Sequence, residues 1–137
     1  MDKEPIIIVG GEPNSVFLEI FFKSIKTNTY KSPLIIIISK KLLVEQMKKL
    51  DFDFEINDID KKLKDFSKLN NNKINLINVD YKFKECFEVI SGKSNNYINE
   101  TFEIALNFVK QNNLSKFNFL ICSLSNFLET TIIKGDP

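Results

Sequence analysis

Histidine is absent from all 137 residues of the chain. His is the side chain that most often binds metals and shuttles protons near neutral pH, so its absence excludes His-ligated metal centres and His-dependent catalysis. Ser123 and Ser125 therefore have no histidine base, and neither can be the activated nucleophile of a Ser-His-Asp triad. We interpret both serines as turn or cap residues.

Long apolar segments and a strong excess of one charge are also missing. No run approaches the roughly 20 residues needed to span a bilayer, and no N-terminal segment has the pattern of a signal peptide. Nineteen Lys and Arg against eighteen Asp and Glu give a formal charge of +1, which favours no nucleic-acid, membrane or acidic partner. Cys86 and Cys122 lie in apolar runs, as small buried residues of a reducing compartment do. We expect a cytoplasmic protein without nucleic-acid or membrane partners.

Apolar strands and amphipathic helices alternate along the first third of the chain. Residues 6–9 are β-branched and predict a buried strand, which ends at the turn 10–13. A helix follows, with Asn14 or Ser15 as its N-cap. Its expected buried positions are Val16, Phe17, Ile20, Phe21 and Ile25. Residues 34–38 predict a second buried strand, followed by a helix that begins near Ser39.

The middle of the chain is less regular. Phe52, Phe54 and Ile56 alternate with acidic residues and predict a short, half-buried strand at a sheet edge. Residues 57–73 are rich in Asp, Lys and Asn and predict a mobile connection with one helical turn, before a strand over 74–77. Residues 81–90 fit strand alternation and helical spacing about equally well, so their structure stays open.

The last third predicts one long helix and one strand. Ser94 or Asn95 caps the helix, which ends near residues 112–113. The apolar face of this helix is expected to contain Tyr97, Thr101, Ile104, Ala105 and Phe108. A final buried strand spans 117–122. This alternation predicts one α/β domain over residues 1–137, with a three-layer, mainly parallel sheet and helices on both faces.

Two loops are candidates for a functional site, because ligands of open α/β sheets bind at the carboxyl ends of strands. They span residues 10–15 and 123–126, and we expect them side by side at one sheet edge. The first loop lacks both the G-x-G-x-x-G and the P-loop patterns, so its spacing favours a structural turn. In that interpretation Glu12 accepts backbone N–H groups rather than acting in catalysis. The candidate site residues are Gly11, Glu12, Pro13, Ser123, Ser125 and Asn126.

The sequence IIIVGGEPNSVFLEI, which begins at Ile6, resembles the opening of the 4-hydroxythreonine-4-phosphate dehydrogenase family. In that family a first strand leads into a Gly-Glu-Pro-Ala-Gly-Ile-Gly-Pro-Glu loop, which Gly11, Glu12, Pro13 and Glu19 match. The segment 117–126 resembles a later strand and its Gly-Pro-Ile-Asn-Lys-like loop, with Asn126 in the Asn position. The resemblance runs from about residue 5 to residue 133, less than half of a typical family member.

The resemblance implies the first lobe of a two-lobed dehydrogenase. In the family, a cleft between the lobes binds NAD or NADP and a phosphorylated hydroxy-amino acid. Histidines from both subunits of a dimer hold a divalent metal. The enzymes oxidise the substrate alcohol, and decarboxylation follows, on the route to pyridoxal phosphate.

This chain departs from the family pattern at positions that matter for activity. The Ala-Gly-Ile-Gly-Pro part of the first loop is replaced by the bulkier residues 14–18, and the Lys of the second loop by Phe127. The metal-binding histidines are absent. We therefore expect a truncated or degenerate family member that is inactive and binds no metal or cofactor as an isolated chain.

Two alternatives stay open. One is a non-catalytic binding or assembly domain, forming a homodimer or pairing with a full-length relative or another partner. The other is an unrelated α/β domain with a small-ligand site, in which the loop similarity is a coincidence.

Overall fold

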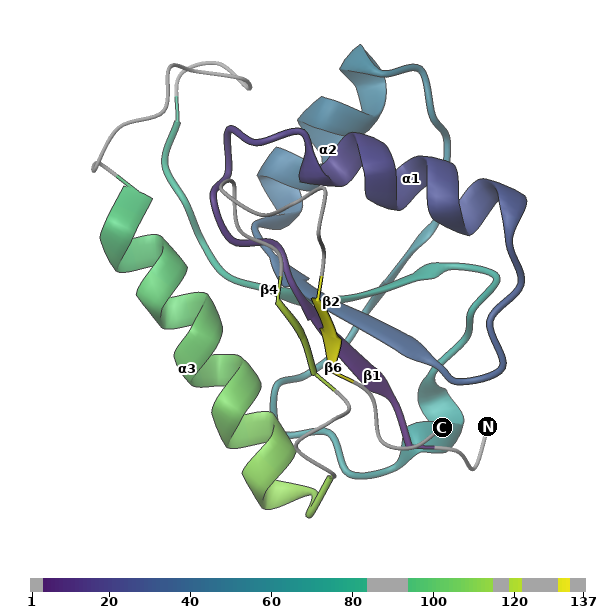
Figure 1. Ribbon diagram of the computed structural model, residues 1–137, viewed down its shortest axis with the longest axis vertical. Helices are drawn as coiled ribbons and strands as arrows, with labels where there is room; N and C mark the ends of the chain where they lie inside the picture. Colours follow the sequence, from purple (N-terminus) through teal and green to yellow (C-terminus); the bar gives the residue numbers. More distant parts are fainter. Residues whose placement is uncertain (1–3, 84–93, 115–118, 122–130, 134–137) are drawn as a thin grey trace.

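Six strands form one sheet at the centre of the structure (Figure 1), a computed structural model that describes residues 4–83, 94–114, 119–121 and 131–133. For the last two ranges it describes the strand backbone alone. The strands are β1 (Ile6–Val9), β2 (Leu34–Ile38), β3 (Ile56–Asp58), β4 (Ile74–Asn78), β5 (Phe119–Ile121) and β6 (Thr131–Ile133). The helices are α1 (Phe17–Thr27), α2 (Lys40–Lys49), α3 (Asn95–Gln111) and the 3-10 turn η1 (Phe66–Lys68).

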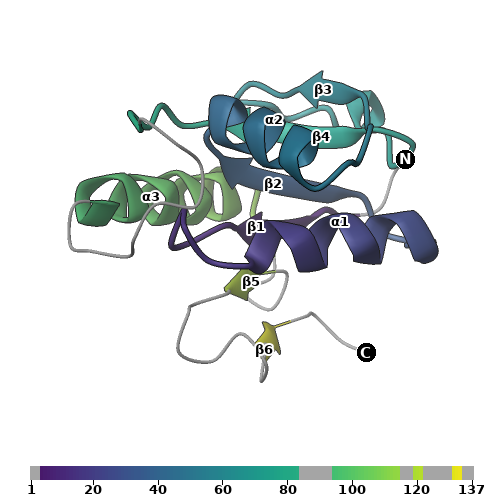
Figure 2. The ribbon, with the colours of Figure 1, turned by 90° about the horizontal axis from the view of Figure 1, so that it is seen from above.

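The strands are ordered β3-β4-β2-β1-β5-β6, and every neighbouring pair is parallel except β5 and β6. Figure 2 shows them following one another in this order. Ile8 lies opposite Ile36 on one side and Leu120 on the other. The predicted mainly parallel α/β sheet is thereby confirmed. Residues 117 and 122 of the predicted last strand lie outside the described residues.

Alternate side chains of the central strands enter two separate cores. Ile7 and Val9 pack in a cluster with Phe108 of α3, whereas Ile8 packs in a cluster with Phe22 of α1 and Leu43 of α2. Helices α1 and α2 therefore cover one face of the sheet and α3 covers the other, as Figure 1 shows. A strand covered on both faces needs apolar residues at every position, which explains the continuous β-branched runs of β1 and β2.

The predicted helix boundaries at Ser39 and near residue 112 are confirmed. Ser39 is the N-cap of α2, and its Oγ accepts the Leu42 N–H at 3.2 Å. Helix α3 ends at Gln111, and the left-handed backbone of Asn113 (φ 52°) turns the chain away from the helix.

The predicted buried face of α1 is partly wrong. Phe17 and Phe21 are buried as expected, together with Leu18 and Phe22, but Val16 and Ile20 are 43% and 45% exposed. The helix begins at Phe17, so Val16 precedes it. The buried stripe is centred on the large rings, and this centre leaves Ile20 at the edge of the stripe. On α3, Phe108 is buried and Ile104 is half-buried, so burial of Ile104 was overestimated.

Two predicted strands also need correction. The edge strand expected over residues 52–56 begins only at Ile56, because the rings of Phe52 and Phe54 pack on Phe22 of α1 at centroid distances of 5.3 and 6.0 Å. The strand after α3 is not the last one, since β6 follows it and pairs with β5 in the antiparallel direction.

Residues 57–73 contain the expected helical turn, η1. Of the open segment 81–90, residues 84–90 lie outside the described part.

The two faces of α3 generate a stability prediction. Phe108→Ala is expected to lower the free energy of unfolding by about 3–5 kcal/mol, because Phe108 fills the core between α3 and the sheet. Leu106→Ala on the same helix is the control, since Leu106 is 56% exposed, and a change within about 0.5 kcal/mol is expected. Denaturant titrations measure both values. Similar losses for the two variants would mean that the buried face of α3 is assigned wrongly.

Candidate ligand-binding edge

The chain reverses its direction across the sheet between β1 and β5. From β1 it moves through β2 to β3 and β4 on one side, and α3 then returns it to β5 on the other side of β1. Helices α1 and α3 lie on opposite faces, so they separate above the carboxyl ends of these two strands. Open α/β sheets bind ligands in the crevice at such a reversal. The loop of residues 10–15, which follows β1, is therefore the described wall of the candidate site.

Two glycines shape the beginning of this loop. The backbone N–H of Gly10 donates to the Ile37 carbonyl at 3.4 Å, which continues the ladder between β1 and β2. A Cβ on Gly10 would lie 2.8 Å from Ile38 Cδ1, so the Ile38 side chain packs in the space that a side chain at this position would need. Gly11 has φ 68°, in the left-handed region that favours glycine. The structure therefore accounts for a glycine at each of these two positions.

Glu12 joins the loop to the beginning of α3. Its Oε1 accepts the Asn14 backbone N–H at 3.2 Å and the Asn14 side-chain amide at 3.4 Å. Its Oε2 accepts a hydrogen bond from the Ser94 hydroxyl at 3.1 Å. Ser94 is the N-cap residue of α3, but its hydroxyl donates to Glu12 rather than capping the helix. The expectation that Glu12 accepts a backbone N–H is confirmed, and the same carboxylate also connects two elements.

Gln46 of α2 holds the loop from the other face of the sheet. Its side-chain amide donates to the Pro13 carbonyl at 3.0 Å, and the residue is only 1% exposed. Its Oε1 is buried and accepts no hydrogen bond from the residues that the structure describes. The loop is thus tied to α3 through Glu12 and to α2 through Pro13. These ties hold it across the point where the two helical layers separate.

Tyr97 fixes the neighbouring edge of the sheet. Its hydroxyl oxygen accepts the backbone N–H of Ser39 at 2.8 Å, so the first turn of α3 is joined to the N-cap of α2. Burial raises the pKa of the Tyr97 phenol above its usual 10.0, although the Ser39 N–H acts in the opposite direction. The phenol therefore stays protonated at neutral pH and cannot act as a base there.

Three of the predicted site residues, Gly11, Glu12 and Pro13, are brought together in this loop at the carboxyl end of β1. The other three, Ser123, Ser125 and Asn126, lie outside the described residues. Ile121, the last residue of β5, pairs with Val9, so β5 ends at the same sheet edge as β1.

Sequence reasoning missed Gln46 and the roles of Ser94 and Tyr97. Gln46 carried a usable signal, because it is a polar residue on the apolar face that Leu42, Leu43 and Met47 form on α2. Such a residue needs a buried hydrogen-bond partner. Ser94 was expected only as a helix cap and Tyr97 only as a core residue. No local pattern gives their partners, which are 82 and 58 residues away.

A separate depression of about 760 Å³ lies beside the N-terminus of α2, at the ends of β2 and β4. Two of the three lysines that line it have internal partners. Lys40 Nζ lies 2.8 Å from Asp58 Oδ2, and Lys41 Nζ lies 5.2 Å from the ring centroid of Phe83. Glu45 and Asp80 also line the depression, so its charges are mixed and define no ligand.

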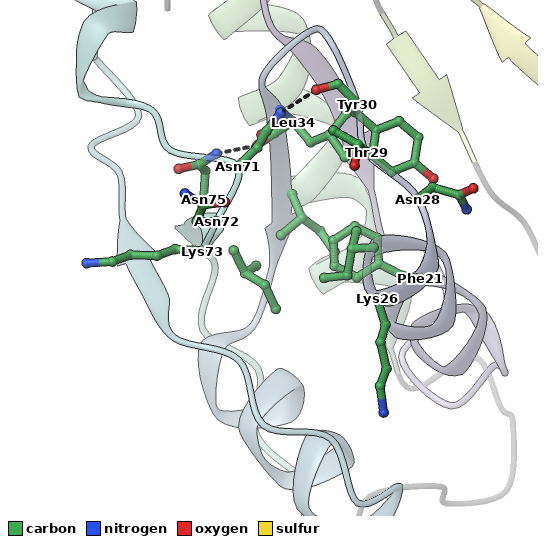
Figure 3. Close-up of a pocket in the computed structure, with 13 residues that line it drawn as sticks. Phe21, Lys26, Asn28, Thr29, Tyr30, Leu34, Asn71, Asn72, Lys73 and Asn75 are labelled. Atoms are coloured by element: carbon green, nitrogen blue, oxygen red, sulfur yellow. Dashed lines mark hydrogen bonds between the residues drawn. The ribbon is translucent and has the colours of Figure 1, made fainter.

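A smaller cavity of about 250 Å³ opens at the opposite, amino edge of the sheet (Figure 3). Asn71 binds three backbone groups there, accepting the Leu34 N–H at 3.0 Å and donating to the carbonyls of Ser32 at 2.8 Å and Tyr30 at 3.3 Å. Asn75 donates to the Leu34 carbonyl at 2.8 Å. These amides hold the chain before β2 and before β4, which is a structural role.

The described residues do not fit the metal that the sequence resemblance implies, and two backbone donors of the loop after β1 are already engaged. No group of three or more His, Cys, Asp or Glu side chains in the described part of the chain is placed to hold a metal ion. In the loop after β1, the Asn14 N–H donates to Glu12 and the Phe17 N–H donates to the Ser15 hydroxyl at 3.3 Å. In this conformation of the loop, these two backbone donors are therefore engaged within the chain itself.

The fold is similar to that of a known dehydrogenase. The structure aligns with the X-ray crystal structure of a 4-hydroxythreonine-4-phosphate dehydrogenase from Burkholderia phymatum, with a TM-score of 0.68 and 16% sequence identity. The alignment covers 87% of this chain and 35% of that chain, so this chain spans about a third of the length of the protein it matches. At this identity the similarity establishes an α/β fold like part of that dehydrogenase.

Comparisons at the level of sequence give no match. No protein-family model matches the chain, and no curated protein does. Among the described residues no helix has the length and apolar character needed to cross a membrane.

The contact between Tyr97 and Ser39 generates a prediction about stability and pH. Tyr97→Phe leaves a buried N–H without its acceptor and is expected to lower the free energy of unfolding by about 1–3 kcal/mol at neutral pH. Above pH 10 the unfolded wild type ionises this phenol while the folded protein resists ionisation, so wild-type stability falls as the pH rises. Denaturant titrations of the wild type and Tyr97→Phe should therefore show that the difference between their free energies of unfolding becomes smaller above pH 10.

Tyr30→Phe is the control for this experiment. It removes a half-buried hydroxyl that pairs with Ser24 and leaves no backbone group unpaired, so the loss should be smaller. Two results would contradict the proposed role of Tyr97. One is an equal loss in the free energy of unfolding for the two variants at neutral pH. The other is a difference in that free energy between the wild type and Tyr97→Phe that stays constant above pH 10.

Proposed function

We propose that this chain is a divergent relative of the 4-hydroxythreonine-4-phosphate dehydrogenases that supplies one wall of a ligand-binding cleft and does not catalyse oxidation by itself. The fold-level similarity to part of such an enzyme supports the relationship. The reversal of the chain between β1 and β5 supports the position of the cleft. Gly11, Glu12 and Pro13 would then face the ligand, which by resemblance is a phosphorylated hydroxy-amino acid.

The observation that carries the non-catalytic part of the proposal is the engagement of Glu12. Oxidation of an alcohol needs a group that takes the hydroxyl proton and an acceptor for the hydride. Glu12 is the carboxylate of the loop, and both its oxygens accept hydrogen bonds from Asn14 and Ser94. Tyr97 stays protonated because it is buried. The chain has no histidine to replace them. The described groups at this edge therefore position the loop rather than transfer protons.

The second candidate function is assembly with another protein chain. It is favoured by the exposed side chains of Val16 and Ile20, which lie one helical turn apart next to the candidate cleft. A full-length relative or a second copy of this chain would supply the groups that the described residues lack.

The catalytic test supplies the isolated chain with NAD or NADP, Mg²⁺ and phosphorylated hydroxythreonine. No reduced cofactor above background is expected in the nicotinamide absorbance. Metal polarisation of the alcohol contributes several kcal/mol to such reactions, and each 1.4 kcal/mol or so that is lost slows the reaction about tenfold. Turnover that survives repurification and is abolished by Glu12→Ala would contradict the proposal.

A full-length relative, alone and mixed with this chain, is the control. Turnover by the relative alone shows that the assay works. A mass by light scattering equal to that of a mixed dimer, with turnover that rises as this chain is added, would favour the assembly function.

A further inference from the structure

The loop of residues 10–15 is held in place by side chains from both helical layers. Ser94 at the start of α3 donates to Glu12, and Gln46 of α2 donates to the neighbouring Pro13 carbonyl. The two helices lie on opposite faces of the sheet, so these contacts connect both helical layers to the loop that follows β1. The loop therefore closes the edge that the fold would otherwise open to a ligand.

The group at the centre of this closure is an anion. The Glu12 carboxylate accepts a backbone N–H of Asn14 on one oxygen and the Ser94 hydroxyl on the other. Backbone N–H and hydroxyl groups are the donors that proteins use to bind carboxylate and phosphate groups of ligands. Glu12 thus occupies the donors that an anionic ligand of this cleft would need.

Gln46 is an independent observation beside this loop, because it carries a buried acceptor that the described residues leave unsatisfied. It is almost fully buried, and its Oε1 has no hydrogen-bond donor among the described residues, whereas its amide nitrogen donates to the Pro13 carbonyl. A buried acceptor without a donor is unfavourable. The closed loop therefore leaves one strong hydrogen-bonding group unsatisfied beside Pro13, and a shifted loop or a bound ligand with an N–H or O–H group would satisfy it.

We propose that Glu12 is an internal substitute for the anionic group of a ligand. When Glu12 binds Asn14 and Ser94, the crevice is closed. When Glu12 withdraws, these donors bind a carboxylate or phosphate group of the ligand. This inference rests on the proposed function only in that the edge beside β1 binds a ligand. It makes Glu12 a switch that competes with the ligand for Asn14 and Ser94.

The test removes the internal anion and supplies an external one. Glu12→Ala is expected to melt below the wild type in sodium chloride, because Asn14 and Ser94 lose their acceptor. Sodium formate of equal ionic strength should raise its melting temperature by about 3 °C or more beyond the rise in the wild type, since formate replaces the missing carboxylate. A parallel series with inorganic phosphate shows whether the larger anion also enters.

Glu19→Ala is the matched control. It removes the same charge from α1, but Glu19 contacts only the exposed Lys23 in the described contacts, so formate and chloride should act on it as on the wild type. Glu12→Ser serves if Glu12→Ala is unfolded in chloride, because it keeps a polar side chain at this position and still leaves the space of the carboxylate free for formate. Formate must then raise its melting temperature more than that of the wild type.

Equal responses of the wild type, the Glu12 variant that folds, and Glu19→Ala would overturn the proposal. An equally large, saturable stabilisation of the wild type by formate would also overturn it, because the crevice would already be open. Neither result depends on turnover, so failure of this inference is distinct from failure of the proposed function.

Discussion

The rest of the structure depends on the parallel pairing of β1 with β2 on one side and β5 on the other. Both faces of β1 are buried, with Ile7 and Val9 facing α3 and Ile8 facing α1 and α2. A strand in this position has no polar surface to present, so it must be apolar at every position and must end abruptly where it reaches solvent. Gly10 and Gly11 provide that end. The position of the candidate cleft follows from the same pairing, because β1 and β5 end side by side at the same edge of the sheet.

Much of this architecture could be predicted from local patterns. The continuous β-branched runs of β1 and β2 and the cap at Ser39 depend on short-range physics, and each lies where its pattern predicts. The buried face of α1 was less predictable. Phe22 of α1 is covered by the rings of Phe52 and Phe54, which come from a segment whose alternation is typical of a strand. Tertiary packing of aromatic rings outweighed the local pattern there.

The candidate site, like the fold, could be predicted from the sequence only in part. Glycines and the Glu-Pro pair at the end of a buried strand were enough to identify the loop. Its partners were not predictable, since Ser94 and Gln46 reach it only after α2 and α3 have packed on opposite faces. The engagement of Glu12 also explains how a loop with family-like residues can serve a structural purpose here: the carboxylate that would face a ligand is bound by the chain itself. The same residue thus accounts for the stability of the edge and for the absence of a free acid in the loop.

The measurement that tests the central claim most directly is a backbone NOE spectrum of the isotopically labelled chain. The account predicts cross-strand NOEs that place Ile8 beside both Ile36 and Leu120, in the pattern of three strands running in the same direction. An antiparallel pattern between β1 and β5, or NOEs that place Leu120 beside a strand other than β1, would contradict it. In that case β1 and β5 would not end side by side at one edge of the sheet, and the proposed cleft would lose its structural basis.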